Sequence, residues 1–126
     1  MIADRDQVLA ATVNNNISLI DTLPDAHFRG GFSMYARPGH ILGATNMPSS
    51  DLLDAAGHYR PYDELEMVYD GDDRNSRVIT YCGGGVAASS VAFTMHRLGF
   101  TDVAVYMGSL QEWAADPANP MMLDTQ

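Results

Sequence analysis

The sequence contains a single cysteine, Cys82, among its 126 residues. One cysteine excludes an internal disulfide, and neither a CxxC pair nor an HxxxH pair is present to bind a metal ion. We therefore expect a free thiol, with no metal and no cofactor. Whether this thiol is inert or reactive is the first question that the sequence raises.

Basic residues and long apolar runs are also scarce. Seven basic residues stand against 16 acidic ones, and the formal net charge is -9. A surface with this charge repels polyanions, so we expect no nucleic acid and no anionic membrane among the partners. No apolar run reaches the ~18 residues of a membrane span, and the start of the sequence, MIADRDQVLA, lacks the basic and apolar stretches of a signal peptide. These absences predict a cytoplasmic protein.

The length and the order of the patterns indicate an α/β fold. A chain of 126 residues can bury one core, whereas two separate cores would each be marginal. We predict one domain over residues 1–126, with residues 1–15 and 115–126 peripheral, as a monomer or a weak homodimer. Short apolar runs alternate with helical patterns, which is typical of α/β proteins.

The clearest local unit is a strand, a glycine-rich loop and a helix in direct succession. Residues 77–81, RVITY, are rich in β-branched side chains, and apolar residues then recur at helical spacing over residues 88–98 until Gly99. A further strand is expected over residues 103–106, parallel to the first. Cys82 would then lie at the C-terminal edge of a sheet, where open α/β folds bind ligands.

The other expected elements are shorter and are separated by Gly, Pro and Asp. The first are an opening helix over residues 3–11, capped by Asp4 or Asp6, a strand over 17–21, and one or two helical turns over 24–28. Helical segments are then expected over 49–53 and 61–69, and Gly71 would end the second of them. The last is a short helix that carries Trp113 and begins with a capping box at 109–112.

Three glycines follow Cys82 directly, in the stretch TYCGGGVAAS. Glycines let successive backbone N–H groups turn inward, and the N-terminus of the next helix adds partial positive charge. We therefore expect the loop to stabilise an anion and to hold the cysteine as a nucleophilic thiolate. The same pattern also fits a buried structural cysteine, or a phosphate-binding loop other than a Walker A loop. The loop residues are Gly83, Gly84, Gly85, Val86 and Ala87.

Four segments, in this order along the chain, resemble a rhodanese domain. They are LID at 19–21, GHILGATNMP at 39–48, YCGGGV at 81–86 and VYMGSLQEW at 105–113. The pattern is most similar to the catalytic C-terminal domain of two-domain thiosulfate and mercaptopyruvate sulfurtransferases. The resemblance implies a rhodanese-like central parallel sheet flanked by helices on both faces. It also implies a sulfurtransferase that moves sulfane sulfur from a donor such as thiosulfate to a thiol or cyanide through a Cys82 persulfide.

The loop departs from the family pattern where the donor would bind. Many members of the thiosulfate type carry basic side chains just after the cysteine, and members of the mercaptopyruvate type usually carry a hydroxyl group there. In this sequence those places are Gly83 and Gly84, and two further family arginines are replaced by Leu23 and, approximately, His27. The preference for thiosulfate or mercaptopyruvate therefore cannot be carried over to this chain.

Two arginines, Arg29 and Arg37, are close enough in sequence to be candidate substrate contacts, although ordinary surface arginines are more common. With backbone donors alone the donor should bind weakly, so a protein persulfide is an alternative donor, and a partner domain could supply the absent charge. A second functional class is a rhodanese-like module that binds partners or senses redox state with little turnover.

Phosphatase chemistry is disfavoured by the same loop. Dual-specificity phosphatases, which are relatives of this fold, have a loop one residue longer that ends in an arginine. Ala88 stands at that place, and the next arginine is Arg97, deep in the expected helix. Without the bidentate donor a phosphoryl group loses its main charge stabiliser. Two other polar residues are interpreted as structural: His40 as the hydrogen-bonding residue of a turn, and Asp21 as an acceptor of backbone hydrogen bonds.

Overall fold

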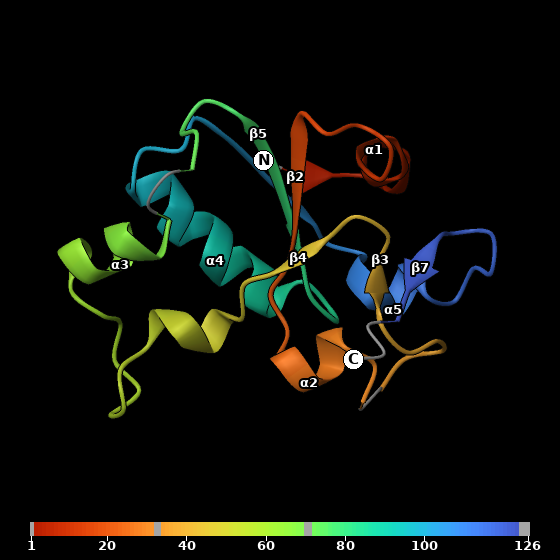
Figure 1. Ribbon diagram of the computed structural model, residues 1–126, viewed down its shortest axis with the longest axis horizontal. Coiled ribbons are helices and arrows are strands. Elements are labelled where there is room, and N and C mark those ends of the chain that lie inside the picture. Colours follow the sequence, from red (N-terminus) through yellow and green to blue (C-terminus); the bar gives the residue numbers. More distant parts are fainter. Residues whose placement is uncertain (1, 32–33, 70–71, 124–126) are drawn as a thin grey trace.

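The computed structural model describes residues 2–31, 34–69 and 72–123 of the chain. Within these residues, five parallel strands form one sheet in the order β1-β6-β5-β2-β4 (Figure 1). A two-stranded antiparallel sheet pairs β3 with β7. The strands are β1 (Ile2–Ala3), β2 (Ile17–Asp21), β3 (His40–Ile41), β4 (Thr45–Asn46), β5 (Arg77–Tyr81), β6 (Asp102–Tyr106) and β7 (Met121–Met122).

Helices cover both faces of the parallel sheet (Figure 1). One face packs against α1 (Arg5–Ala11) and α5 (Ser109–Trp113). The other packs against the 3-10 helix η1 (Ser49–Leu52), α3 (Tyr62–Val68) and α4 (Val86–Arg97). The short helix α2 (Asp25–Phe28) follows β2. The predicted α/β fold with a central parallel sheet between helices is confirmed.

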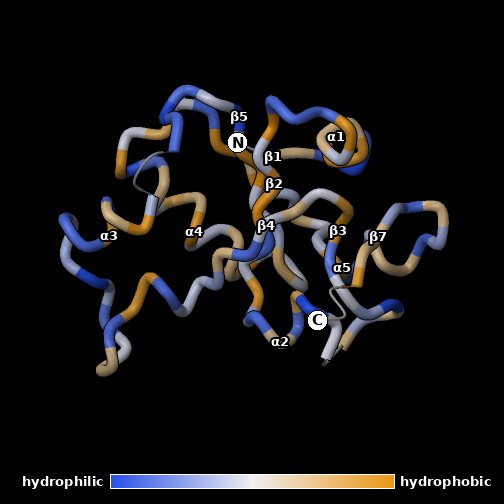
Figure 2. Tube along the Cα trace, in the orientation of Figure 1, coloured by the Kyte–Doolittle hydropathy of each residue, from blue (hydrophilic) through white to orange (hydrophobic). Residues whose placement is uncertain are grey.

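Alternation along the strands decides which helices each side chain meets. In β2, Leu19 joins the core beneath α1 and α5, whereas the next residue, Ile20, joins the core beneath α3 and α4. In β5, Val78 and Ile79 divide in the same way, and all four side chains are buried. Figure 2 shows the hydrophobic colour along these central strands. Because both faces are covered, β2 and β5 each carry two apolar residues in succession, as is usual in parallel sheets.

Most of the local sequence predictions are confirmed. Helix α1 begins after Asp4, whose Oδ1 accepts the Gln7 N–H at 2.9 Å while Gln7 Oε1 accepts the Asp4 N–H at 2.8 Å. The strand expected over 103–106 begins one residue earlier and is parallel to β5. Gly99 follows α4 with a φ of 97°, a left-handed conformation that favours glycine. The predicted helix end at Gly71 lies outside the described residues.

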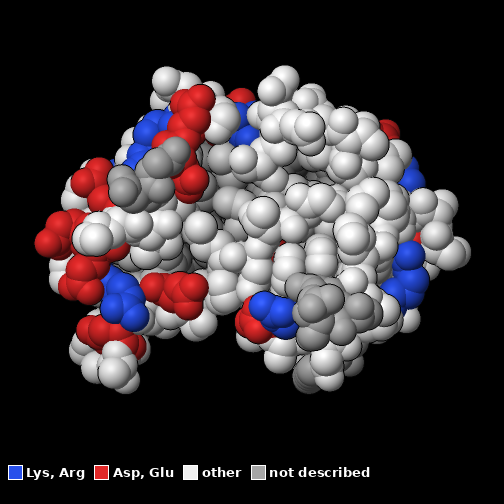
Figure 3. Space-filling model, viewed as in Figure 1, with Lys and Arg blue, Asp and Glu red and all other residues white. Residues whose placement is uncertain are grey.

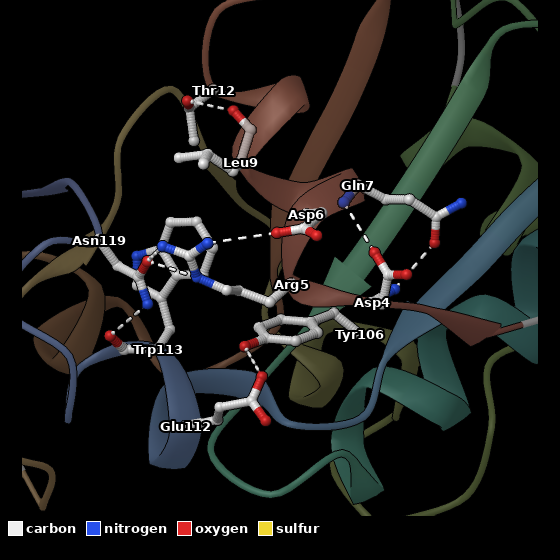
Figure 4. A network of polar contacts seen from close by, with 10 residues as sticks. All are labelled: Asp4, Arg5, Asp6, Gln7, Leu9, Thr12, Tyr106, Glu112, Trp113 and Asn119. Carbon is white, nitrogen blue, oxygen red and sulfur yellow. Dashed lines mark hydrogen bonds and ion pairs between the residues drawn. The ribbon is translucent and has the colours of Figure 1, made fainter.

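The two end segments, predicted to be peripheral, both contribute to the packed structure. At the start of the chain, β1 forms the edge of the sheet beside β6, and α1 buries side chains in the core. Near the other end, Asn119 is buried. Its Oδ1 accepts the Arg5 Nε–H at 2.8 Å, and its Nδ2 donates to the Trp113 carbonyl at 3.2 Å (Figure 4). These bonds tie α1, α5 and the segment after α5 together.

The charged surface is uneven. In Figure 3 the acidic side chains gather over α3 and the segments next to it, while the middle of this face carries few charges. Among the helices that the structure describes, none is both long and apolar enough to cross a membrane.

Candidate active site

Cys82 lies directly after β5, at the C-terminal edge of the sheet, as predicted. The residue is 3% exposed and packs with Ala88 and Val105. Its Sγ accepts the backbone N–H of Gly85 at 3.0 Å. The thiol is therefore buried at the base of the glycine loop, with a backbone donor already directed at the sulfur.

The backbone conformation of the loop depends on Gly85. This residue precedes α4 with a φ of 99°, which a side chain rarely tolerates. A β-carbon there would also lie 3.1 Å from Met107 Cε and 3.2 Å from the Met107 carbonyl oxygen. Behind it, α4 begins at Val86, and the first N–H groups of a helix have no partner within the helix. The loop and the helix start thus present backbone donors and partial positive charge beside Sγ.

The loop is held by the segment that joins β6 to α5. The hydroxyl of Ser109 accepts the Cys82 N–H at 3.1 Å and donates to the Tyr106 carbonyl at 2.7 Å. The Leu110 N–H donates to the Cys82 carbonyl at 2.9 Å, and the Gln111 N–H donates to the Gly83 carbonyl at 3.0 Å. Because these four bonds are spread over consecutive residues, they fix the backbone on both sides of the thiol.

The predicted capping box at 109–112 is wrong. Ser109 has a φ of 51°, and its side chain bonds Cys82 and Tyr106 rather than a helix N–H. The residue at the cap position of α5 is Gly108, which has no side chain to offer. The Glu112 carboxylate accepts the Tyr106 hydroxyl at 2.5 Å (Figure 4). Ser109 therefore holds the cysteine loop and does not cap α5. Its left-handed backbone conformation is the local strain that accompanies this position.

Asp21 ends β2 beside the last residue of β5, Tyr81. The carboxylate is fully buried, and its Oδ1 accepts the Leu23 N–H at 2.9 Å. Burial raises the pKa of Asp21 to about 6. Next to it, both the N–H and the hydroxyl of Thr22 donate to the Tyr81 carbonyl at 2.9 Å. The structural interpretation of Asp21 is confirmed, because the residue anchors the turn after β2 next to the cysteine loop.

His40 also has the structural role that the sequence predicted. Its Nδ1 lies 2.8 Å from the Phe28 carbonyl oxygen. The rings of His40 and Phe28 are also stacked, with centroids 3.8 Å apart. His40 therefore joins β3 to the end of α2.

The two candidate arginine contacts have partners in the structure. Arg29, the residue after α2, has its Nε 2.9 Å from the carboxylate of Asp25 at the start of that helix. Arg37 donates to the carbonyl groups of four residues at and after the end of α5, namely Trp113, Ala114, Asp116 and Asn119. These bonds give Arg37 a role in holding the C-terminal segment, and a substrate contact by either arginine stays a prediction.

The sequence did not reveal three side chains that lie against the loop. A β-carbon on Gly83 would overlap the hydroxyl of Tyr35, and one on Gly84 would lie 3.8 Å from Oε1 of Gln111. Met107 lies against Gly85. Bare glycines imply that other groups fill the space, but no sequence pattern says which distant residue does so.

Comparisons with known proteins agree with this arrangement. A family model described as the rhodanese-like domain matches residues 4–116. Over 87 residues, 68% of this chain, the sequence is 38% identical to thiosulfate/3-mercaptopyruvate sulfurtransferase 1, mitochondrial, of Arabidopsis thaliana. Over 111 residues, 86% of this chain, it is 31% identical to the thiosulfate sulfurtransferase of Gallus gallus. The matched parts cover only 23% and 38% of those two proteins.

Solved structures support the fold alone. The crystal structure of the anaerobic ergothioneine biosynthesis enzyme from Chlorobium limicola, in complex with trimethyl histidine, superposes with a TM-score of 0.86. The match covers 99% of this chain and 32% of that enzyme, at 23% sequence identity.

Proposed function

Because the chain belongs to the rhodanese-like domain family, we propose that it is a sulfurtransferase in which Cys82 carries the transferred sulfur as a persulfide. The observation that carries this proposal is the hydrogen bond from the Gly85 N–H to Cys82 Sγ at 3.0 Å. A donor in this position stabilises the negative charge on Sγ of the thiolate. The named relatives are sulfurtransferases of which this chain matches a part, and they support the same chemistry.

The first half of the reaction is attack by the thiolate on a sulfane donor. With thiosulfate, Sγ forms a bond to the outer sulfur, the S–S bond of the donor breaks, and sulfite leaves with the electron pair. The thiolate and the dianion become a persulfide anion and a sulfite dianion, so the charge balances without an added oxidant or reductant. We expect the backbone N–H groups at the start of α4 to stabilise the terminal sulfur, which carries the negative charge of the persulfide.

The second half of the reaction regenerates the Cys82 thiolate. A nucleophile, such as a thiol or cyanide, attacks the terminal sulfur of the persulfide, and the Cys82 sulfur leaves as thiolate. Cyanide becomes thiocyanate in this step. We expect small sulfane donors and thiol acceptors in the cytoplasm, with a protein persulfide as the alternative donor.

Turnover tests this proposal. The protein should convert thiosulfate and cyanide to thiocyanate, and Cys82→Ser should abolish the conversion because no thiolate remains to accept sulfur. Ser89→Ala is a matched control: Ser89 is an exposed residue of α4 whose hydroxyl donates to the Gly85 carbonyl at 2.7 Å, so the variant keeps both the thiol and the Gly85 N–H. Equal turnover in wild type and Cys82→Ser would refute the proposal. A wild-type protein without turnover whose partner binding changes on Cys82 oxidation would indicate the redox-sensing module instead.

A further inference from the structure

Tyr35 covers the first residue of the cysteine loop. A β-carbon on Gly83 would overlap the Tyr35 hydroxyl, and it would lie 3.1 Å from the Cε2 atom of the ring. The backbone of Gly83 is not in the left-handed region, so backbone conformation does not require glycine at this position. It is Tyr35 that excludes a side chain from Gly83, and the phenol occupies the space that such a side chain would fill.

Neighbouring side chains fix the position of the Tyr35 ring. Tyr35 is half-buried and packs against the core beneath α1 and α5. It meets the ring of His27 edge-on, with centroids 5.4 Å apart and planes at 60°. His27 is buried at α2, and burial lowers the pKa of its imidazole, which keeps that neighbour uncharged near neutral pH. The ring therefore has a defined position, with the hydroxyl over Gly83.

The second loop residue has a comparable neighbour. The Gln111 N–H is bound to the Gly83 carbonyl, and the Gln111 side chain lies 3.8 Å, through Oε1, from the place of a Gly84 β-carbon. Gly84 and Gln111 are exposed, whereas Gly83 is buried. The two positions without side chains are thus flanked by a phenol and an amide from other segments. Both groups are neutral and can donate hydrogen bonds.

We propose that Tyr35 is a substrate-contacting residue whose hydroxyl donates a hydrogen bond to an anionic oxygen of the sulfur donor while Cys82 takes the outer sulfur. This proposal rests on the proposed function and adds the donor class, a small sulfane oxyanion of which thiosulfate is the simplest example. The hydroxyl keeps its proton throughout. The bond that breaks is the S–S bond of the donor, and sulfite leaves still hydrogen-bonded to Tyr35.

The division of the site supports this assignment. The Gly85 N–H donates to Sγ of Cys82, and α4 begins at the next residue. The phenol lies over Gly83, immediately next to the cysteine along the chain. We expect a donor that presents its outer sulfur to Sγ to direct its oxygen atoms towards Gly83, where the Tyr35 hydroxyl takes the place of the side-chain charge that a glycine cannot supply.

Binding to a protein that cannot react tests the contact without turnover. In a Cys82→Ser background, calorimetry gives the dissociation constant of thiosulfate, and Tyr35→Phe should raise this constant about tenfold. This is the lower end of the range for a hydrogen bond to a charged group, because the site is half-exposed. The matched control is Tyr62→Phe at the exposed start of α3, which should leave the constant unchanged. Equal binding with and without the Tyr35 hydroxyl, or no binding of thiosulfate to Cys82→Ser, would overturn the proposal.

The two half-reactions separate a substrate contact from a structural role. With an intact Cys82, Tyr35→Phe should raise the thiosulfate concentration for half-maximal loading about tenfold and leave the discharge of a preformed persulfide by cyanide unchanged. Equal slowing of both halves would show that Tyr35 only supports the loop. If the wild-type protein takes up no sulfur, the proposed function fails, while the binding comparison in Cys82→Ser still decides the role of Tyr35.

Discussion

The Ser109 hydroxyl accepts the backbone N–H of Cys82 at 3.1 Å, in a buried position between β5 and α5. Among the described residues, this hydroxyl is the acceptor of the Cys82 N–H, and it also donates to the Tyr106 carbonyl. Ser109→Ala removes both bonds and leaves a buried donor unsatisfied. We expect the free energy of unfolding to fall by about 1–3 kcal/mol, as measured by urea denaturation.

A control for Ser109 is Ser76→Ala, which removes the hydrogen bond from the Ser76 hydroxyl to the Asp73 carbonyl in an exposed loop. Water replaces an exposed bond, so the expected loss is below about 0.5 kcal/mol. Equal losses in the two variants would show that the buried hydrogen bond between Ser109 and Cys82 stabilises the fold no more than an exposed one.

Gly83 and Tyr35 should behave as a coupled pair. Gly83→Ala places a methyl group on the Tyr35 hydroxyl, and we expect loading of Cys82 to slow by an order of magnitude or more because the phenol or the loop has to move. In a Tyr35→Ala background the methyl group has space, so Gly83→Ala should then have little further effect. A double-mutant cycle on the loading rate measures this coupling.

Gly84→Ala is the matched comparison for Gly83→Ala. Its β-carbon would lie at an ordinary contact distance of 3.8 Å from Gln111 Oε1, and the backbone is not left-handed. Loading should therefore change little. Additive effects of Gly83→Ala and Tyr35→Ala would contradict the overlap described above.

Stability should depend on the ionisation of Asp21. The pKa of this carboxyl is raised from 3.8 to about 6 by burial, so the folded state holds its proton more tightly than the unfolded state. The stabilisation of the folded state by the protonated Asp21 is then fully present below about pH 4, and it is lost as the pH rises towards 6 and above. A rise of the pKa from 3.8 to about 6 corresponds to a contribution to the free energy of unfolding of at most about 3 kcal/mol.

Asp21→Asn isolates this contribution. The amide keeps the oxygen that accepts the Leu23 N–H, and it cannot ionise. The difference in the free energy of unfolding between Asp21→Asn and wild type should therefore grow in favour of the variant between pH 4 and pH 7. A difference that is independent of pH would show that Asp21 does not titrate in this range.

Arg37 should matter for stability. Its guanidinium donates to four carbonyl groups at and after the end of α5, and Arg37→Gln should lower the free energy of unfolding by about 1–3 kcal/mol. Arg29→Gln removes an exposed ion pair between the two ends of α2 and should lower the free energy of unfolding by about 0.5 kcal/mol or less. Denaturation curves check both values. A rise in the thiosulfate concentration for half-maximal loading with unchanged stability would instead make either arginine a substrate contact.

The sequence predicted the part of the site that is continuous along the chain. The strand over 77–81, the loop from Gly83 and the helix after it could be found because periodicity and glycine content are local signals. Asp21 was interpreted correctly for the same reason, since it bonds Leu23, which is 2 residues away in the sequence. The hydrogen bond that the sequence predicted for His40 is also present, although its partner, Phe28, is 12 residues away.

The remaining features depend on contacts between distant segments. The pattern SLQE at 109–112 satisfies the rule for a capping box, but Ser109 instead faces the Cys82 N–H, which only the folded sheet brings close. The contact between Tyr35 and Gly83 could not be predicted because no local sequence pattern links these two segments. The space that a glycine leaves shows that something lies there, and the identity of that group is decided by tertiary packing.

The most direct test of the account is the mass of the protein after treatment with thiosulfate. The wild-type chain should gain one sulfur atom, located on the peptide that contains Cys82, and should lose it again on addition of cyanide with release of thiocyanate. Cys82→Ser should gain none. An unchanged mass in the wild-type protein, or an equal gain in Cys82→Ser, would contradict the assignment of Cys82 as the sulfur carrier.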